Sequence, residues 1–140
     1  MTSDTRPKQV AFEFSLGRRK VRIGGMCKGA GMICPNMATM LCTITCDAKI
    51  AQETLATAVR HATELSFNRV CVDNDMSTND TVLCLANGLS GVSIEPGTPG
   101  YDAFAAALTS VCQQMAQMLV RDGEGVTKFV EIQVEGAGND

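Results

Sequence analysis

The N-terminal part of the chain alternates apolar and polar residues in a way that predicts a β-hairpin. Gln9 to Leu16 (QVAFEFSL) alternates with a period of two, Gly17 and Arg18 suit a turn, and Lys20 to Ile23 resumes the alternation. Residues 24–38 (GGMCKGAGMICPNMA) then hold four glycines and a proline, which discourage regular structure and let backbone approach a ligand closely. We interpret this stretch as a site-forming loop.

A strand followed by a helix is predicted after this loop. Thr39 to Cys46 (TMLCTITC) is rich in β-branched and apolar residues, and Asp47 is a suitable N-cap for a helix over residues 49–65. That helix would place its apolar side chains near one face, namely Ile50, Leu55, Ala58, Val59 and Ala62. His61 lies within the helix, and because the chain has no second histidine we interpret it as a surface or boundary residue.

The second half of the chain also alternates between strand-like, loop-like and helix-like patterns. They predict a short strand (Arg69–Val72), a polar loop (Asp73–Asp80), a buried strand (Thr81–Ala86), an exposed connection (Ser90–Gly100), a long core-facing helix (Tyr101–Val120) and a final strand (Thr127–Val134). The pattern as a whole predicts an α+β domain over residues 1–140, with strands packed against two main helices.

Composition and charge narrow the classes of function. At 140 residues and 45% hydrophobic residues, the chain suits one globular domain. The formal net charge of −3, without a run of Lys or Arg, argues against nucleic acid as a partner. No apolar stretch approaches the ~20 residues that span a bilayer, and the polar start MTSDTRPKQ is unlike a signal peptide. We therefore expect a cytoplasmic protein with no membrane partner.

Seven cysteines give no sign of a disulfide framework or a metal site. Their number is odd and no CxxC pair occurs. Most lie among apolar neighbours, where a free thiol behaves as a small buried hydrophobe. We expect free thiols and no bound metal.

Four ordered motifs identify a family resemblance. The stretch GGMCKGAGMICPNMATML (Gly24–Leu41) closely resembles the processing-site motif of the ornithine acetyltransferase, or bifunctional glutamate N-acetyltransferase, family of arginine biosynthesis. Three further segments resemble family motifs in the same order: MTSDTRPK (Met1–Lys8), STNDTVL (Ser77–Leu83) and DGEGVTK (Asp122–Lys128). Four motifs across most of the chain are far more specific than one glycine-rich loop. The resemblance implies a segment of that family's self-processing mixed α/β sandwich fold.

The resemblance implies a self-cleaving enzyme with a threonine nucleophile. Family precursors cut themselves between the alanine and threonine that correspond to Ala38 and Thr39, so residues 1–38 would end an α-chain-like part and residues 39–140 would begin a β-chain-like part. A threonine hydroxyl alone is a poor nucleophile, but a neutral α-amine on the same residue, with a pKa of about 7.7 to 8.0, accepts its proton. Thr39 would then supply both nucleophile and base.

The implied reaction moves acetyl from N-acetylornithine to glutamate through an acetyl-threonine, in a ping-pong cycle. It needs no cofactor, and acetyl-CoA stays open as a second acetyl donor. By position in the motifs, Lys28 would bind a substrate carboxylate, Glu124 would bind the substrate amine and transfer protons, and Thr2 would contact substrate. Asn79 and Asp80 look structural, because such side chains brace loops through backbone hydrogen bonds. The family also implies an α/β-chain heteromer that forms homo-oligomers.

Two departures from the family pattern keep alternatives open. Family members have an upstream Thr-Gly pair as oxyanion hole and a downstream asparagine in the substrate site, and neither is found in these 140 residues. An inactive fragment or non-catalytic subunit, and an N-terminal-threonine amidase or peptidase, are therefore alternatives. Cys34 stands before Pro35 where many relatives carry histidine, and it would be reactive if a nearby positive charge lowered its pKa.

Overall fold

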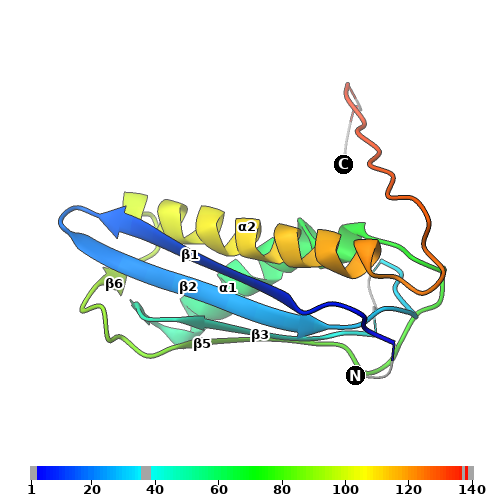
Figure 1. The fold of residues 1–140 in the computed structure, drawn as a ribbon. Helices are drawn as coiled ribbons and strands as arrows, with labels where there is room; N and C mark the ends of the chain where they lie inside the picture. The colour runs from blue at the N-terminus through cyan, green and yellow to red at the C-terminus, as the bar shows by residue number, and fades with distance from the viewer. Residues whose placement is uncertain (1–2, 36–38, 137, 139–140) are drawn as a thin grey trace.

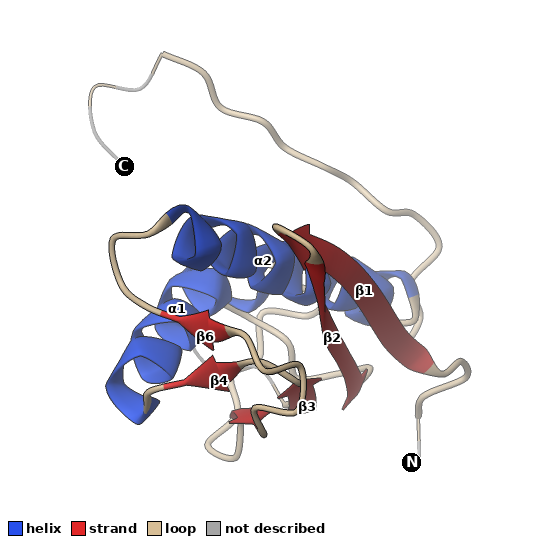
Figure 2. Ribbon diagram, turned by 90° about the vertical axis from the view of Figure 1, so that its left-hand side faces the viewer, coloured by secondary structure: helices blue, strands red, loops and turns tan. Residues whose placement is uncertain are grey.

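A four-stranded sheet covered on one face by two helices forms the body of the protein. The structure is a computed structural model that describes residues 3–35, 39–136 and 138 (Figure 1). Its elements are β1 (Lys8–Leu16), β2 (Arg19–Lys28), β3 (Leu41–Cys46), β4 (Lys49–Ile50), α1 (Gln52–Glu64), the 3₁₀ turn η1 (Phe67–Arg69), β5 (Thr81–Ala86), β6 (Ser93–Ile94) and α2 (Pro99–Arg121). Figure 2 shows both helices on the same side of the sheet. The α+β class predicted from the pattern is confirmed.

The predicted hairpin is confirmed, but its second strand is longer than expected. β1 and β2 pair antiparallel around Gly17, which has a positive φ of 62°. β2 continues through Gly24 and Gly25 into the stretch that we predicted as loop. A Cβ on Gly25 would lie 3.0 Å from both Ile44 and Met115 side chains, so this glycine lets helix and strands pack closely. Packing across the sheet, rather than irregular backbone, explains these two glycines.

The centre and one edge of the sheet come from β3 and β5. The strand order is β1-β2-β3-β5, with β2 and β3 antiparallel and β3 and β5 parallel. β3 begins at Leu41, two residues later than predicted, so Thr39 precedes the strand. β5 was predicted as a buried strand, but it has only one neighbour in this sheet and exposes Leu83 and Leu85. One face of β5 therefore packs against the core and the other is exposed.

The first helix begins later than its pattern predicted. Its N-cap is Ala51, not Asp47, and residues 49–50 form the short strand β4, which pairs parallel with β6. Asp47 instead accepts a hydrogen bond from Arg22 N at 2.8 Å, so its side chain braces β2. Ala58 and Ala62 are buried, which confirms the predicted face of the helix.

The long helix α2 is the main apolar layer over the sheet. Thr98 caps its start through a hydrogen bond from Tyr101 N, and Pro99 occupies the first turn. By length and composition alone, α2 is apolar enough to cross a membrane, contrary to our expectation that no stretch approaches this limit. Its buried residues pack into the core beside β1 and β2: Phe104, Leu108, Val111, Cys112, Met115, Ala116 and Leu119. We interpret it as a core helix.

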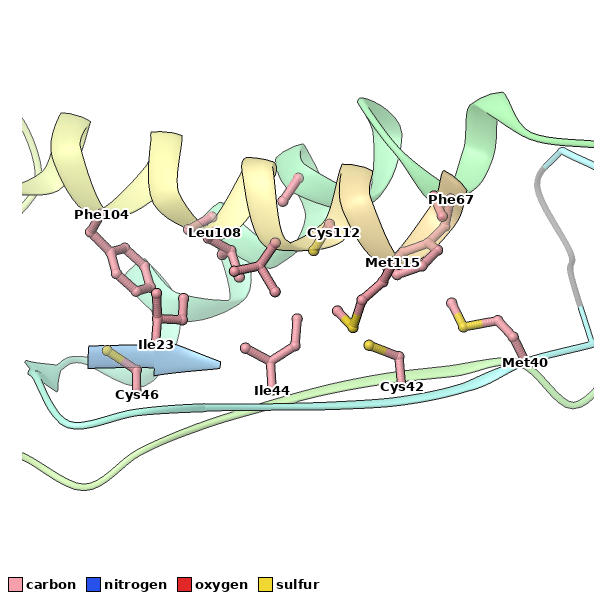
Figure 3. Close-up of a cluster of buried hydrophobic side chains, with 14 of the residues drawn as sticks. Ile23, Met40, Cys42, Ile44, Cys46, Phe67, Phe104, Leu108, Cys112 and Met115 are labelled. Carbon is pink, nitrogen blue, oxygen red and sulfur yellow. The ribbon is translucent and has the colours of Figure 1, made fainter. Parts of the chain in front are cut away.

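One continuous hydrophobic core lies between the helices and the sheet (Figure 3). β3 contributes Cys42, Ile44 and Cys46, whose side chains alternate with exposed ones along the strand. Met40, immediately after Thr39, is 3% exposed and lies at one end of this cluster. Burial of a side chain of this size stabilises a fold by about 1.5–3 kcal/mol, so the core anchors the residue that follows Thr39.

Two of the predicted strands do not form. Arg69 ends the turn η1, and residues 70–72 make one backbone hydrogen bond to the glycine-rich stretch, from Val72 N to Ile33 O, rather than a ladder. Residues 127–134 run away from the domain without pairing to a strand among the described residues (Figure 1). Val130 and Ile132 are 72% and 84% exposed. An alternating pattern needs a neighbouring edge to become a strand.

The face of the sheet opposite the helices carries exposed apolar side chains. Met26 of β2, Leu41 of β3, and Leu83 and Leu85 of β5 are each at least half exposed. Their register places Met26 opposite Thr43, and Leu41 opposite Thr81, on the same side of the sheet. We call this surface the open face.

Candidate active site

A buried ionic cluster joins the N-terminal segment to the end of α2. Lys8 Nζ lies 2.7 Å from Asp4 Oδ1 and 2.6 Å from Asp122 Oδ2, and the three side chains are only 1%, 4% and 5% exposed. Asp122 also accepts hydrogen bonds from the backbone and hydroxyl of Thr5. Charges this buried are stable only when paired and hydrogen-bonded, so the cluster fixes residues 4–8 against the end of α2.

The electrostatics of this cluster are strongly coupled. Burial alone would raise the pKa of Asp122, but hydrogen bonds from Lys8 and Thr5 outweigh it and hold that pKa well below its ordinary value. For Asp4, burial is again outweighed by hydrogen bonds, from Gly29 and Lys8, and the pKa is lowered. Burial would lower the pKa of Lys8, yet both carboxylates together raise it. All three groups are therefore charged at neutral pH.

The glycine-rich loop (residues 29–33) is the point where distant segments meet. Gly29 N donates to Asp4 Oδ1 at 2.8 Å, and Ala30 O accepts from Glu124 N at 2.7 Å. A Cβ on Gly31 would lie 3.3 Å from the carboxyl carbon of Glu124. These contacts bring the segment after Thr2, the loop and the acidic motif together, as three of the resembling motifs require.

Thr39 lies directly against this loop. Its backbone N donates to Met32 O at 2.7 Å, and a Cβ on Gly29 would lie 2.6 Å from Thr39 O. Gly29 has a φ of +146°, which a side chain would strain. Among the described residues the Thr39 hydroxyl is buried and has no hydrogen-bond partner. A buried hydroxyl without a partner is costly, and a catalytic role is one of the explanations for such a group.

Of the other predicted site residues, Lys28 and Glu124 lie near the same loop. Lys28 ends β2, opposite Leu41 in β3, and precedes Gly29. Glu124 is exposed and follows the buried Asp122 by two residues. The predicted substrate contact Thr2 and the residue before the cleavage point, Ala38, lie outside the described residues.

Two aspartates hold the backbone on either side of the candidate nucleophile. Asp80 Oδ1 accepts from Met40 N at 3.1 Å, which confirms its predicted bracing role, and burial raises its pKa. Asp73 accepts from Met32 N at 2.7 Å and from Ile33 N at 3.1 Å. From the sequence, Asp73 is predicted only as part of a polar loop. Its spacing from the glycines, about forty residues, carries no local signal.

Cys34 does not meet the condition for a reactive thiol. Burial, together with the nearby Cys71, Asp73 and Asp75, raises its pKa instead of lowering it. The neighbouring charges are negative, so they oppose thiolate formation. The hypothesis that a positive charge activates Cys34 is wrong in this structure.

Two cavities of the domain lie beside the loop rather than on it. One, about 600 Å³, lies between the end of α1, α2 and the C-terminal stretch, and its lining includes none of the predicted site residues. A second, about 340 Å³, is bordered by Met40 and Asp80 on one side and α1 on the other. Neither cavity is lined by Thr39, Lys28 or Glu124.

The fold and the site together define an α+β domain whose glycine-rich loop contacts a threonine and is braced by a buried ionic cluster. Comparison with known proteins gives its family. Residues 1–140 match the ArgJ family. The chain is 52% identical over 139 residues to a glutamate N-acetyltransferase of Methanocaldococcus jannaschii, covering 98% of this chain and 34% of that protein. It is 53% identical over 138 residues to the arginine biosynthesis bifunctional protein ArgJ of Symbiobacterium thermophilum, with 98% and 34% covered.

A solved structure agrees. The crystal structure of the arginine biosynthesis bifunctional protein ArgJ of Bacillus halodurans is similar, with a TM-score of 0.57 and 41% identity, over 61% of this chain and 40% of that one. The chain therefore belongs to the ArgJ family. It spans about a third of the length of the curated relatives that it matches.

Proposed function

We propose that this chain is the self-cleaving segment of a glutamate N-acetyltransferase, with Thr39 as the nucleophile. The observation that carries the proposal is the position of Thr39 in this chain, which belongs to the ArgJ family. Its nitrogen is bound by Met32 O, its hydroxyl is buried, and the predicted substrate residues Lys28 and Glu124 adjoin the same loop. The names of the relatives support the acyl-transfer reaction.

In the proposed cleavage, the Thr39 hydroxyl attacks the carbonyl carbon of Ala38. The hydroxyl proton leaves, the C–N bond breaks, and the Thr39 nitrogen takes up a proton, so the peptide becomes an ester. Water then hydrolyses that ester, which frees the carboxylate of Ala38 and restores the hydroxyl beside a new α-amine. The hydrogen bonds from Thr39 N to Met32 O and from Met40 N to Asp80 Oδ1 hold the backbone of Thr39 on both sides of its Cα, which favours this attack by orientation.

In the proposed transfer, the same hydroxyl takes acetyl from N²-acetylornithine. The α-amine of Thr39 accepts the hydroxyl proton and delivers it to the leaving amine of ornithine. The amine of glutamate then attacks the acetyl ester and releases N-acetylglutamate, which restores the hydroxyl. Acetyl-CoA would enter the same step as an alternative donor, and no cofactor or metal takes part.

The ionic and polar residues around the loop would select the substrates. The Lys28 ammonium suits the α-carboxylate that ornithine and glutamate share. Glu124, held through its backbone to Ala30, is the candidate for amine binding and proton transfer. Thr2 would add a further contact, two residues before Asp4. Substrate binding therefore depends on the buried cluster, which fixes residues 4–8 to the end of α2.

The oxyanion hole and the asparagine of the family site would come from the part of the relatives that this chain does not match. The open face, with Met26, Leu41, Leu83 and Leu85 exposed, offers apolar surface for that part. The α/β-chain heteromer, its homo-oligomer and a cytoplasmic location belong to the same proposal.

Trapping the acetyl group tests the proposed function. The purified protein and a Thr39→Ala variant are incubated with N²-acetylornithine, quenched in acid, and digested for peptide mass spectrometry. One acetyl group on the Thr39 peptide, lost when glutamate is added, supports the transferase. No acetylation points to an inactive segment that needs further chains. Release of ammonia from amino-acid amides, without acetyl transfer, would select the amidase alternative.

A further inference from the structure

The carboxylate of Asp73 binds two consecutive backbone N–H groups of the glycine-rich loop. Oδ2 accepts from Met32 N at 2.7 Å and Oδ1 accepts from Ile33 N at 3.1 Å. Met32 has a positive φ of 52°, which non-glycine residues rarely adopt. Successive N–H groups around such a residue form a concave anion site, and Asp73 fills it. The two hydrogen bonds hold the loop in this uncommon conformation.

The hydrogen bond from Ile33 N to Asp73 also orients the carbonyl of Met32, to which Thr39 N donates. The carbonyl of Met32 and the N–H of Ile33 belong to one peptide group, which is planar. When Asp73 fixes the Ile33 N–H, it therefore fixes the direction of Met32 O, the atom that accepts from Thr39 N at 2.7 Å. A turn of this peptide group would break both contacts together.

We propose that Asp73 is a positioning residue for the nitrogen of Thr39. Through the peptide between Met32 and Ile33 it holds that nitrogen as an amide before cleavage and as an amine afterwards. A carbonyl accepts an N–H from either group, so the contact persists when the nitrogen becomes the base. Asp73 touches neither Thr39 nor substrate in this account. The catalytic part of the inference rests on the proposed function, whereas the fixed peptide group does not.

The test compares Asp73→Asn with Asp75→Asn. Asparagine keeps the size of the side chain but has one acceptor oxygen and no charge, so the N–H groups of Met32 and Ile33 both lose a charge-assisted hydrogen bond and one of them loses its acceptor entirely. Asp75 is exposed in the same polar loop as Asp73, and its carboxylate makes no hydrogen bond to the described residues. Asp75→Asn therefore makes the same change in charge without the change in contacts.

The first measurement does not depend on cleavage. Both substitutions are made in a Thr39→Ala background, and hydrogen exchange is followed at the amide of position 39 and at Ile44 in β3. Asp73→Asn is expected to speed exchange at position 39 by about tenfold or more, because a charge-assisted hydrogen bond is lost, and to leave Ile44 unchanged. Equal exchange at position 39 in the two variants overturns the proposal. Faster exchange at both sites in Asp73→Asn also overturns it, because the role would then be general stability.

The second measurement follows cleavage between Ala38 and Thr39 by intact mass, with Thr39 present. Asp73→Asn is expected to slow cleavage by about tenfold or more, and Asp75→Asn to keep the parental rate. Cleavage of Asp73→Asn at the parental rate overturns the proposal. If the parent itself does not cleave, the proposed function fails for this chain and hydrogen exchange alone decides the role of Asp73.

Discussion

Replacing Lys8 by methionine removes the only cation of the buried cluster and should destabilise the protein severely. The two carboxylate oxygens that contact Nζ are at most about 5.3 Å apart, given their distances of 2.7 and 2.6 Å from that atom. At an effective dielectric constant of about 20, two negative charges at this separation repel by about 3 kcal/mol. Breaking a buried ion pair by removing one partner costs about 3–5 kcal/mol, so both estimates predict a loss of this size at pH 7.

The pH dependence of this loss is a second signature. In the parent, Asp4 and Asp122 have pKa values below their ordinary 3.8, so their contribution to stability is present above pH 3.8 and is lost as the pH falls through the lowered pKa values. In Lys8→Met, burial and mutual repulsion raise the pKa values of both carboxylates. The stability difference between the two proteins should therefore shrink as the pH falls towards 4.

Urea unfolding, followed by far-UV circular dichroism at pH 7 and pH 4.5, measures both effects. Lys20→Met is the matched control, because Lys20 pairs with Glu13 at the surface and is 64% exposed. It should leave the unfolding midpoint almost unchanged. Equal midpoints for Lys8→Met and Lys20→Met at pH 7 would refute the reasoning, as would a loss that does not depend on pH.

Two substitutions near the threonine and one labelling experiment give three further predictions. In Gly29→Ala the new Cβ would collide with Thr39 O. This variant should therefore lose about 1–3 kcal/mol of stability in urea unfolding and should not cleave in an intact-mass assay. Normal cleavage would contradict this contact. Asp80→Ala should also lower the free energy of unfolding by about 1–3 kcal/mol, because Met40 N loses its acceptor. A more stable variant in urea unfolding would show that this hydrogen bond contributes nothing. In timed alkylation of the native protein, the exposed Cys71 should react before the buried core thiols, and the reverse order would contradict the packing.

The sequence predicted those elements whose pattern is local. The alternation of residues 9–16 and the helical spacing of residues 101–120 both appear in the structure, with ends moved by a few residues. Thr127–Val134 carries an equally clean alternation, yet no described strand lies beside it. Strand formation depends on a partner edge, which a pattern within the segment cannot supply.

The candidate site shows the same division between local motif and distant contact. The motifs indicated Thr39, Lys28 and Glu124 by resemblance, and the structure places all three near one loop. The contacts that hold this loop come from Asp73 and from the Asp4–Lys8–Asp122 cluster, in which Lys8 and Asp122 lie 114 residues apart in the chain. Such pairs leave no periodic or spaced signal in a single sequence. The glycines at 24 and 25 misled for a related reason, because their role is to admit side chains from other elements.

The most direct test of the central claim is intact mass spectrometry of the freshly purified protein beside Thr39→Ala and Thr43→Ala. Thr43 lies in β3 on the exposed side of the strand, so its hydroxyl controls for the loss of any threonine. We predict two fragments, cut between Ala38 and Thr39, from the parent and from Thr43→Ala, and one intact chain from Thr39→Ala. Cleavage of Thr39→Ala at the same bond, or an intact parent chain, would contradict the assignment of Thr39 as the self-cleaving nucleophile of this chain.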